Sequence, residues 1–272
     1  MRAGGWRWAG LAGAGLVLLV AAFAPLLAPY DARKIAGPPL MKPSGEHWFG
    51  TDSNGLDVFS QTVMATRLDV LIAVTTVLAA TALGMAAGLA IGMNESGRGG
   101  IGVLARAGAR AADFVQAVPA VLVGLVAVGL YGSTPVTITV AIVIILMPMQ
   151  ARLVRTEVLQ VRGEAYLDAA RMAGTSELRL TVRHVLPNVA RPAVLYMSVL
   201  FGVSIMLTAA LGFLGVGVAA PTPEWGAMIS RGATDASLGH WWPALFPLTV
   251  LILTVLAVTA AFSTFQQGRQ RR

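Results

Sequence analysis

The chain of 272 residues contains no cysteine, which excludes a disulfide framework and a thiolate metal site. Redox chemistry therefore gives no information about the compartment. Charged residues are also scarce: they make up 12% of the chain, against about 25% in an ordinary soluble domain. Hydrophobic residues make up 56%, and the mean hydropathy is +0.71. This composition predicts a membrane protein and argues against a soluble domain.

Charge is missing altogether from six apolar runs of about 20 residues, the length that crosses ~30 Å of hydrocarbon. These predicted spans are 9–29, 70–93, 114–131, 134–151, 193–214 and 244–265, and none contains Lys, Arg, Asp, Glu or His. Only residues 132–135 separate the third span from the fourth. The expected fold class is therefore all-α, a polytopic membrane protein of about six transmembrane helices.

Lysine is nearly absent, since only Lys34 and Lys42 accompany the arginines that give the net charge of +7. The arginines lie beside the apolar runs, which favours a membrane explanation over nucleic-acid binding. The N-terminus, 94–113, 152–192 and the C-terminal tail together hold 15 of the 20 basic residues. This bias predicts that both termini are cytoplasmic.

The first apolar run also resembles a secretory signal, because Arg2 and Arg7 precede it and Ala22-Phe23-Ala24 resembles a cleavage site. Its length exceeds the usual signal core, so we interpret it as a retained helix. The segments 30–69 and 215–243 are predicted to be external loops, with the tryptophans of the second at the headgroup level.

Several kinds of chemistry are absent. Neither lysine is followed by Ser or Thr, so the chain has no phosphate-binding loop and cannot itself be an ATPase. An ion-coupled carrier usually needs charged residues inside its spans, which the predicted spans lack. Asp113 lies at a span entrance beside Arg110, and we expect it to form an ion pair or to meet water and not to relay protons. A membrane enzyme is also disfavoured, because His47, His184 and His240 are scattered and no carboxylate stands at ligand spacing beside the two external ones.

A polar, Arg-rich island at 152–192 interrupts the apolar pattern. A helix is predicted from Glu164 to Ala173, followed by a break at Gly174. Thr175 or Ser176 can cap a second helix that Pro187 is expected to end. Leu178, Val182 and Val185 form an apolar stripe, which predicts a packing partner for that helix. Basic helices also lie on anionic lipid, so spacing alone leaves both interpretations open.

The island resembles the EAA loop of ABC-importer permeases through Asp168-Ala169-Ala170, Gly174 and His184-Val185-Leu186-Pro187-Asn188. The family's leading Glu is Asp168 here, which keeps the charge on a side chain one methylene shorter. The resemblance implies a coupling helix that docks on a cytoplasmic ATPase. The residues expected to couple are Asp168, Ala169, Ala170, Gly174, His184, Leu186, Pro187 and Asn188.

Three further segments resemble the dipeptide, oligopeptide and nickel importer permeases, most closely the C-type member of the pair. They are His47–Asp52 with Gly55 and Asp57, Leu211–Gly217 with Pro221–Gly226, and Trp242–Pro247. In that family an Arg commonly follows the glycine that corresponds to Gly55; this chain has Leu56 there. Peptide is the substrate that the resemblance favours; nickel chelates, haem and other small nutrients stay open.

The resemblance also implies the surroundings of the chain. The expected fold is that of a type I ABC importer permease in the bacterial plasma membrane. The expected partners are a homologous permease subunit, two cytoplasmic ATPase subunits that carry ATP and Mg, and an extracytoplasmic solute-binding protein. No cofactor is expected on this chain. Its expected parts are a first helix with an external loop (1–66), a permease core (67–266) and a basic tail (267–272).

Finally, Gly84, Gly88 and Gly92 repeat at the small-xxx-small spacing of close helix packing. We interpret them as packing residues, within this subunit or between subunits.

Overall fold

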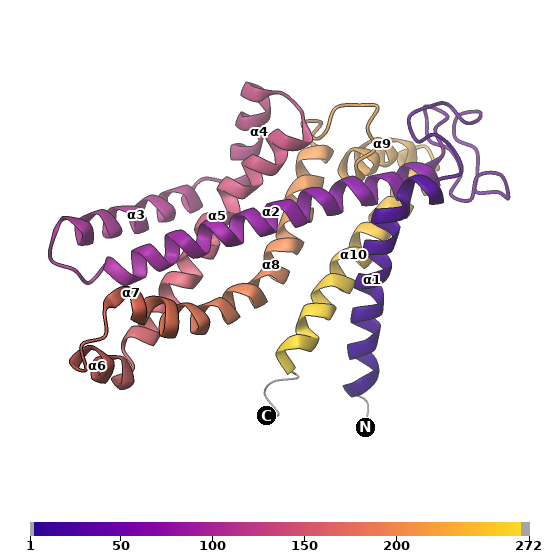
Figure 1. Ribbon diagram of the computed structural model, residues 1–272. Coiled ribbons are helices and arrows are strands. Elements are labelled where there is room, and N and C mark those ends of the chain that lie inside the picture. The colour runs from indigo at the N-terminus through magenta and orange to yellow at the C-terminus, as the bar shows by residue number, and fades with distance from the viewer. Residues whose placement is uncertain (1–2, 268–272) are drawn as a thin grey trace. The chain divides into compact units, whose positions relative to one another are not determined.

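The computed structural model describes residues 3–267, and within that range it contains helices and no strand. The elements, drawn in Figure 1, are α1 (Ala3–Leu27), α2 (Val58–Asn94), α3 (Gly100–Ala117), α4 (Ala120–Tyr131), α5 (Pro135–Arg162), α6 (Ala165–Met172), α7 (Glu177–Leu180), a π-helical turn (Thr181–Val185), α8 (Leu186–Phe213), α9 (Trp225–Ser237) and α10 (Trp242–Gln267). The all-α, polytopic class predicted from the sequence is confirmed. Arg2, which was counted in the positive-inside bias, and residues 268–272 of the predicted basic tail lie outside the described residues.

Five stretches of the described chain are long and apolar enough to cross a membrane, namely those in α1, α2, α5, α8 with the turns before it, and α10. The predicted third span, 114–131, is wrong as a continuous helix. Val118 is extended, with φ −80° and ψ 131°, because Pro119 disfavours a helical residue before it. α4 then has 12 residues, about 18 Å of rise, and is too short to cross alone. α3 and α4 make a sixth span only as a broken pair.

α2 also corrects the expectation that 58–69 is loop and that the spans carry no charge. The helix begins at Val58 and so includes Arg67 and Asp69. Asp69 is buried at 1% exposure. A buried carboxyl group in a candidate span removes one reason for setting the carrier class aside.

The chain divides into two compact units. One unit holds the chain up to Thr75, Val121–Ile142 and the chain from Phe201 onward; the other holds Thr76–Ala120 and Val143–Leu200. We call them the first and the second unit and describe each by itself.

In the first unit, α1 lies along α10, as Figure 1 shows (indigo and yellow). Small residues allow this contact: a Cβ on Gly10 would lie 2.8 Å from the backbone of Ala260, and one on Gly13 would lie 3.0 Å from Ala257 Cβ. The predicted external segment 215–243 contains the helix α9, which packs on α10. Of the tryptophans of this segment, Trp225 and Trp242 are buried, while Trp241 is half exposed. Their place at the headgroup level stays a prediction.

The loop 28–57, also in the first unit, is ordered around a buried histidine. His47 Nδ1 lies 2.9 Å from Asp57 Oδ1, and the His47 ring tilts against Tyr30 at 4.9 Å between centroids. Trp242 Nε1 donates to Thr51 O at 3.1 Å. The expectation that His47 is an ordinary surface residue with no carboxylate beside it is therefore wrong, because turns bring Asp57 back to it. The pair is satisfied within the fold, and the described residues contain no cluster of three or more metal-ligating side chains.

The second unit is built on α2 and α5. A Cβ on Gly84 would lie 2.6 Å from Gln150 Cβ, and the Cβ positions of Gly88 and Gly92 fall equally close to Val154 and Val158, at 2.8 Å each. The three glycines therefore let the two helices touch, as the small-xxx-small spacing predicted, and the contact is within the subunit.

Candidate functional site

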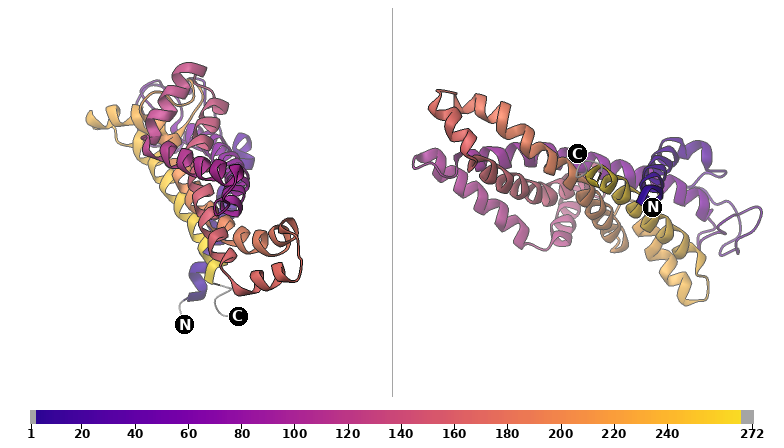
Figure 2. Two further views of the ribbon diagram at one scale, coloured as in Figure 1. Left: turned by 90° about the vertical axis from the view of Figure 1, so that its left-hand side faces the viewer. Right: turned by 90° about the horizontal axis from the view of Figure 1, so that it is seen from below.

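The polar island folds as a hairpin in the second unit, which we define as residues 163–188: α6, the turn at Gly174, α7, the π-helical turn and the start of α8. Figure 2 shows it between the end of α5 and the beginning of α8. Its base is a buried apolar cluster of Val154, Val158, Leu167, Leu180, Val185, Val189 and Ala193. This cluster joins α6 and α7 to α5 and α8.

The turn between α6 and α7 depends on Gly174. Its φ is +80°, in the left-handed region that glycine adopts without steric cost. The amide of Thr175 donates to Ala170 O at 3.1 Å and that of Gly174 to Arg171 O at 2.9 Å, which is the Schellman arrangement. A Cβ here would meet nothing within 4 Å. The break predicted at Gly174 is thus confirmed. Glycine is favoured there by the positive φ and not by a lack of space for a side chain.

Arg171 braces the turn. Its Nη1 donates to Asp168 Oδ1 at 2.8 Å and its Nε to Glu177 Oε1 at 2.9 Å, so one guanidinium joins α6 to α7. The hydrogen bond that Arg171 donates to Glu177, together with the one that it donates to Asp168, raises the pKa of Arg171. The Asp168 and Glu177 side chains stay 66% and 59% exposed. Solvent screens such pairs, so each carboxylate is free to exchange Arg171 for another cation at small cost.

The second helix of the hairpin departs from its prediction. Ser176 is at the N-cap position, as predicted, but its side chain makes no capping bond. Pro187 does not end the helix, which runs on as α8 to Phe213. Proline normally clashes with the carbonyl four residues earlier. Here the π-helical turn widens the backbone before Pro187, with the amide of Leu186 donating to Thr181 O five residues back.

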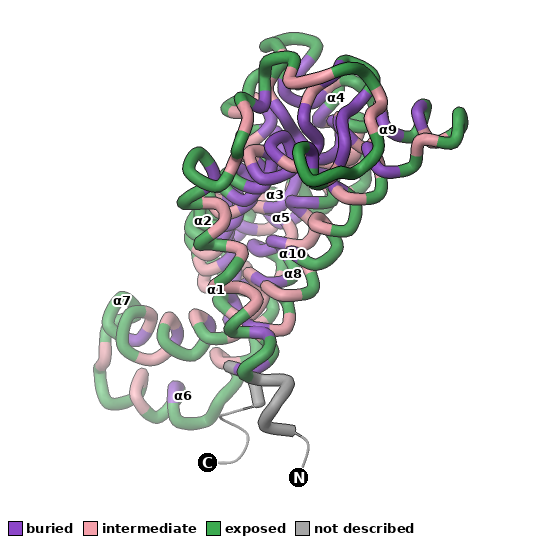
Figure 3. The backbone as a smooth tube through the Cα atoms, turned by 90° about the vertical axis from the view of Figure 1, so that its right-hand side faces the viewer, coloured by how far each residue is buried: buried purple, intermediate pink, exposed green. Residues whose placement is uncertain are grey.

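Several apolar side chains of the hairpin are exposed among its charged ones. Leu178 is 75% exposed and Val182 57%, whereas Val185 is buried. The predicted stripe is therefore split: one member packs inside the subunit, and two face outward with Met172 and Tyr166. Figure 3 shows α6 and α7 mostly in the colour of exposed residues. Apolar side chains grouped on an exposed surface are typical of a binding face.

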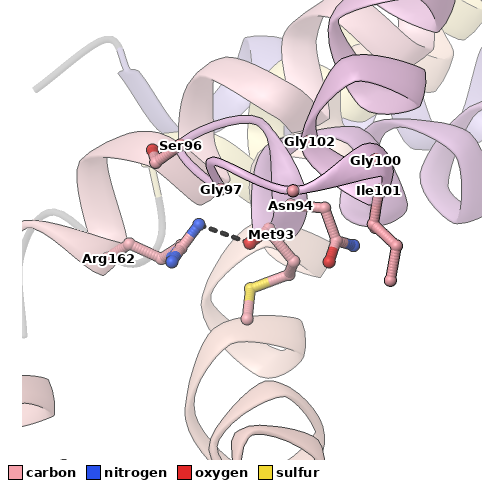
Figure 4. Close-up of a pocket in the computed structure, with 9 residues that line it drawn as sticks. Met93, Asn94, Ser96, Gly97, Gly100, Ile101, Gly102 and Arg162 are labelled. Atoms are coloured by element: carbon pink, nitrogen blue, oxygen red, sulfur yellow. Dashed lines mark hydrogen bonds between the residues drawn. The ribbon is translucent and has the colours of Figure 1, made fainter.

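Charged contacts fix the end of α5 that supports the hairpin. Arg155 grips Glu95 with two hydrogen bonds of 2.6 and 2.5 Å, which lower the pKa of Glu95. Asp113, which was expected to pair or to meet water, pairs with Arg152 at 2.5 Å. Arg162 Nη1 donates to the carbonyls of Gly92 and Met93 at 3.0 and 2.5 Å. Figure 4 shows Arg162 at one side of a cavity of about 440 Å³ formed with residues 93–102.

The structure places the predicted coupling residues unevenly. Asp168 and Ala169 are exposed on α6, while Ala170 packs against the apolar cluster. Asn188 Nδ2 donates to His184 O at 2.7 Å, and His184 faces the ring of Tyr166 at 6.0 Å. Leu186 and Pro187 lie on the first turn of α8, with no hydrogen bond to Asp168 among those of the described residues.

Sequence reasoning missed Arg171, Leu167 and Tyr166. The spacing of Asp168 and Arg171, three residues apart on one helix, was a usable signal for the ion pair. Nothing in the sequence distinguished Leu167 and Leu180, which are buried, from Leu178, which is exposed.

A comparison with known families matches residues 80–272 to the binding-protein-dependent transport system inner membrane component. This region contains the whole hairpin and most of the chain. The chain belongs to this family of ABC-importer permeases. It is therefore a multi-pass protein of the inner membrane.

Individual relatives agree with this assignment. The permease is 34% identical over 244 residues to the glutathione transport system permease protein GsiD of Pectobacterium atrosepticum, an alignment that covers 89% of this chain and 79% of the relative. The proteins of the same name from Escherichia coli O1:K1 and Shigella boydii serotype 4 are also 34% identical, over 89% of this chain and 78% of theirs. These relatives are transport permease subunits, and family membership implies ATPase and binding-protein partners for this permease.

Proposed function

We propose that this permease forms half of the translocation pathway of an ATP-driven importer of short peptides, and that the hairpin at 163–188 couples it to a cytoplasmic ATPase. The observation that carries the proposal is the construction of the hairpin: exposed apolar side chains and carboxylates on the outside, and a buried cluster joined to α5 and α8 on the inside. A surface of this kind takes up a displacement and passes it on.

The coupling residues are proposed to act in different ways. Asp168 offers a carboxylate that a basic side chain of the ATPase can take over from Arg171, and Ala169 lets the partner's backbone come close. Gly174 sets the angle of the hairpin. Ala170 packs against its base, and His184, Leu186, Pro187 and Asn188 fix its junction with α8.

The assembly is proposed to contain a homologous permease subunit, two ATPase subunits and an extracytoplasmic binding protein, with both termini of this chain in the cytoplasm. ATP and Mg bind to the ATPases, and this chain hydrolyses nothing. The division into 1–66, the permease core 67–266 and the tail 267–272 belongs to the same proposal. Peptide is favoured as the substrate because the relatives' names give glutathione, itself a short peptide, and because the external motifs resemble peptide permeases.

The test is reconstitution of the full importer, with its own binding protein, into proteoliposomes. Asp168→Lys should reduce ATP-driven uptake at least about tenfold, the loss that corresponds to 1.4 kcal/mol, while insertion and thermal stability stay normal. Arg33→Lys, on the loop of the first unit, is the matched control and should transport like the unchanged protein. Full uptake by Asp168→Lys would refute the coupling role.

The same preparation tests the class of transporter and the substrate. The permease alone, given an ion gradient and no ATPase, should not transport. Uptake under these conditions would establish an ion-coupled carrier. The buried Asp69 is the structural observation that speaks for that class. Competition with di- and tripeptides, glutathione, nickel chelates and haem at the binding protein identifies the cargo. Binding of a metal chelate or haem alone would refute the peptide assignment.

A further inference from the structure

Two buried carboxyl groups meet at the start of α9 in the first unit. Glu224 is completely buried, and Asp69 of α2 is 1% exposed. Both serve the same helix end: Asp69 Oδ2 accepts from the amide of Trp225 at 3.0 Å, and Glu224 accepts from those of Gly226 and Ala227 at 2.7 and 3.0 Å. Three consecutive amides are thus shared between two acids.

The fold leaves room for Glu224 and little else. Gly212 and Gly217 lie against its carboxylate, so a side chain at either position would collide with Oε2. Trp225 fixes the other side, because its indole Nε1 donates to Thr62 O of α2 at 3.4 Å and the ring is wholly buried. Water therefore has no access through which to solvate two negative charges.

The charges around the pair do not balance it. On α9 the nearest cation is Arg231, whose Nη2 donates to Gln61 at 3.3 Å, and Asp235 adds a further acid. On α2 the other charged residue nearby is Arg67, which is exposed. The neighbouring segment 201–223 carries no charged residue. Among the residues that the structure describes, Asp69 Oδ1 has no hydrogen-bond donor. An ionised oxygen in that position is costly, whereas a protonated one is neutral.

We propose that Asp69 and Glu224 form a proton-binding site in which one proton is held by the pair, and that its occupancy sets how firmly α9 is held on α2. With the proton bound, one negative charge remains to accept from the α9 amides. Without it, two like charges share a site closed to water, and the first turn of α9 is held less tightly. Burial supports this directly, since it raises the pKa of Glu224 to about 7 even against its two backbone hydrogen bonds and Arg231.

The stability that Glu224 contributes falls as the pH rises. A carboxyl group that holds its proton more tightly in the folded state than in the unfolded state contributes less to stability as the pH rises. For Glu224 this decline begins near its ordinary pKa of 4.5 and is complete above about 7. Glu224 is therefore protonated in acidic medium and loses its proton as the medium passes neutrality.

The experiment uses the full permease pair in lipid nanodiscs, titrated from acid to alkaline pH. Infrared spectroscopy should show the carbonyl band of a buried protonated carboxyl group, lost on alkalinisation together with hydrogen-exchange protection of the amides at 225–227. Asp69→Asn removes the like charge and should lower the apparent proton affinity of the remaining acid by about tenfold, one pKa unit. Asp31→Asn, at an exposed acid of the same unit, should change neither signal.

Three outcomes would overturn the proposal. The first is a wild-type spectrum without such a band at any pH, a result that needs no variant to fold. The second is a band that both Asp69→Asn and Glu224→Gln leave unchanged. The third is restoration of protection at alkaline pH by added Ca²⁺ and its loss with a chelator, since the pair would then hold a cation and not a proton.

Discussion

At the scale of single residues, the hairpin depends on one conformation and one side chain. Gly174 supplies a positive φ with open space around it, and Arg171 ties the two helices across that turn. The two contributions differ in kind: the first is steric and local, while the second is electrostatic, exposed and easily exchanged. Substitutions that separate them show which one the coupling needs.

Gly174→Val should cost about 1–2 kcal/mol, because a β-branched residue resists the left-handed conformation. Gly174→Asn should cost much less, since Asn tolerates that region and the space beside it is open. We expect ATP-driven uptake in the order Gly, Asn, Val, measured at equal amounts of inserted protein. Equal uptake by the Asn and Val variants would show that the positive φ is not what matters at this position.

At the scale of elements, the hairpin presents exposed apolar side chains on its outer face and has a firmly packed base. Leu178 and Val182 lie on α7 and the π-helical turn, pointing away from the cluster that holds Leu180 and Val185. Neighbours along the chain thus serve opposite sides of the same small motif. Leu180 and Val185 stabilise the subunit by packing in its core, and Leu178 and Val182 are left exposed.

Because the chain has no cysteine, single thiols can report on that face. A thiol at Leu178→Cys should react quickly with maleimide in the isolated permease and at least about tenfold more slowly once the ATPases are bound, since a docked surface excludes reagent. Leu238→Cys, 70% exposed at the end of α9, is the control and should react equally in both states. Unchanged labelling of Leu178→Cys would place the ATPase elsewhere.

The helices and their breaks also show how much of the fold could be predicted from the sequence. Apolar runs predicted the long helices because hydrocarbon imposes a length, and Gly174 predicted a break because few residues tolerate its φ. The break at Pro119 and the passage of α8 through Pro187 were both misread: proline's effect depends on whether the neighbouring backbone can widen, which a π-helical turn allows at 181–185. His47 and Asp57 were missed as a pair because turns, and not periodicity, bring them together.

At the scale of the whole molecule, the apolar helix α8 lies along the chain between the hairpin, which precedes it, and α9, which follows it and where the carboxyl pair is. Because α8 is long and apolar enough to span a membrane, we predict that it crosses once and that the hairpin and α9 lie on opposite sides. This holds whether or not α3 and α4 make a span. With the positive-inside bias of the arginines, we predict that the hairpin is cytoplasmic and that the carboxyl pair lies on the outer side.

A membrane-impermeant thiol reagent tests this topology in intact cells. Leu238→Cys should be labelled from outside, and Met172→Cys, 84% exposed on α6, only after permeabilisation. Labelling of both from outside would contradict a single crossing by α8. Labelling of Met172→Cys alone would reverse the orientation of the molecule.

The π-helical turn at Thr181–Val185 has one more consequence. It accommodates one residue more than an α-helical turn would, directly where the hairpin becomes α8. Should it tighten to α-helical geometry, the helix beyond it would advance by a single position, a rotation of about 100° with a shift of about 1.5 Å. Force on the hairpin could then turn α8 about its own axis as well as tilt it, presenting a different row of side chains to whatever passes alongside.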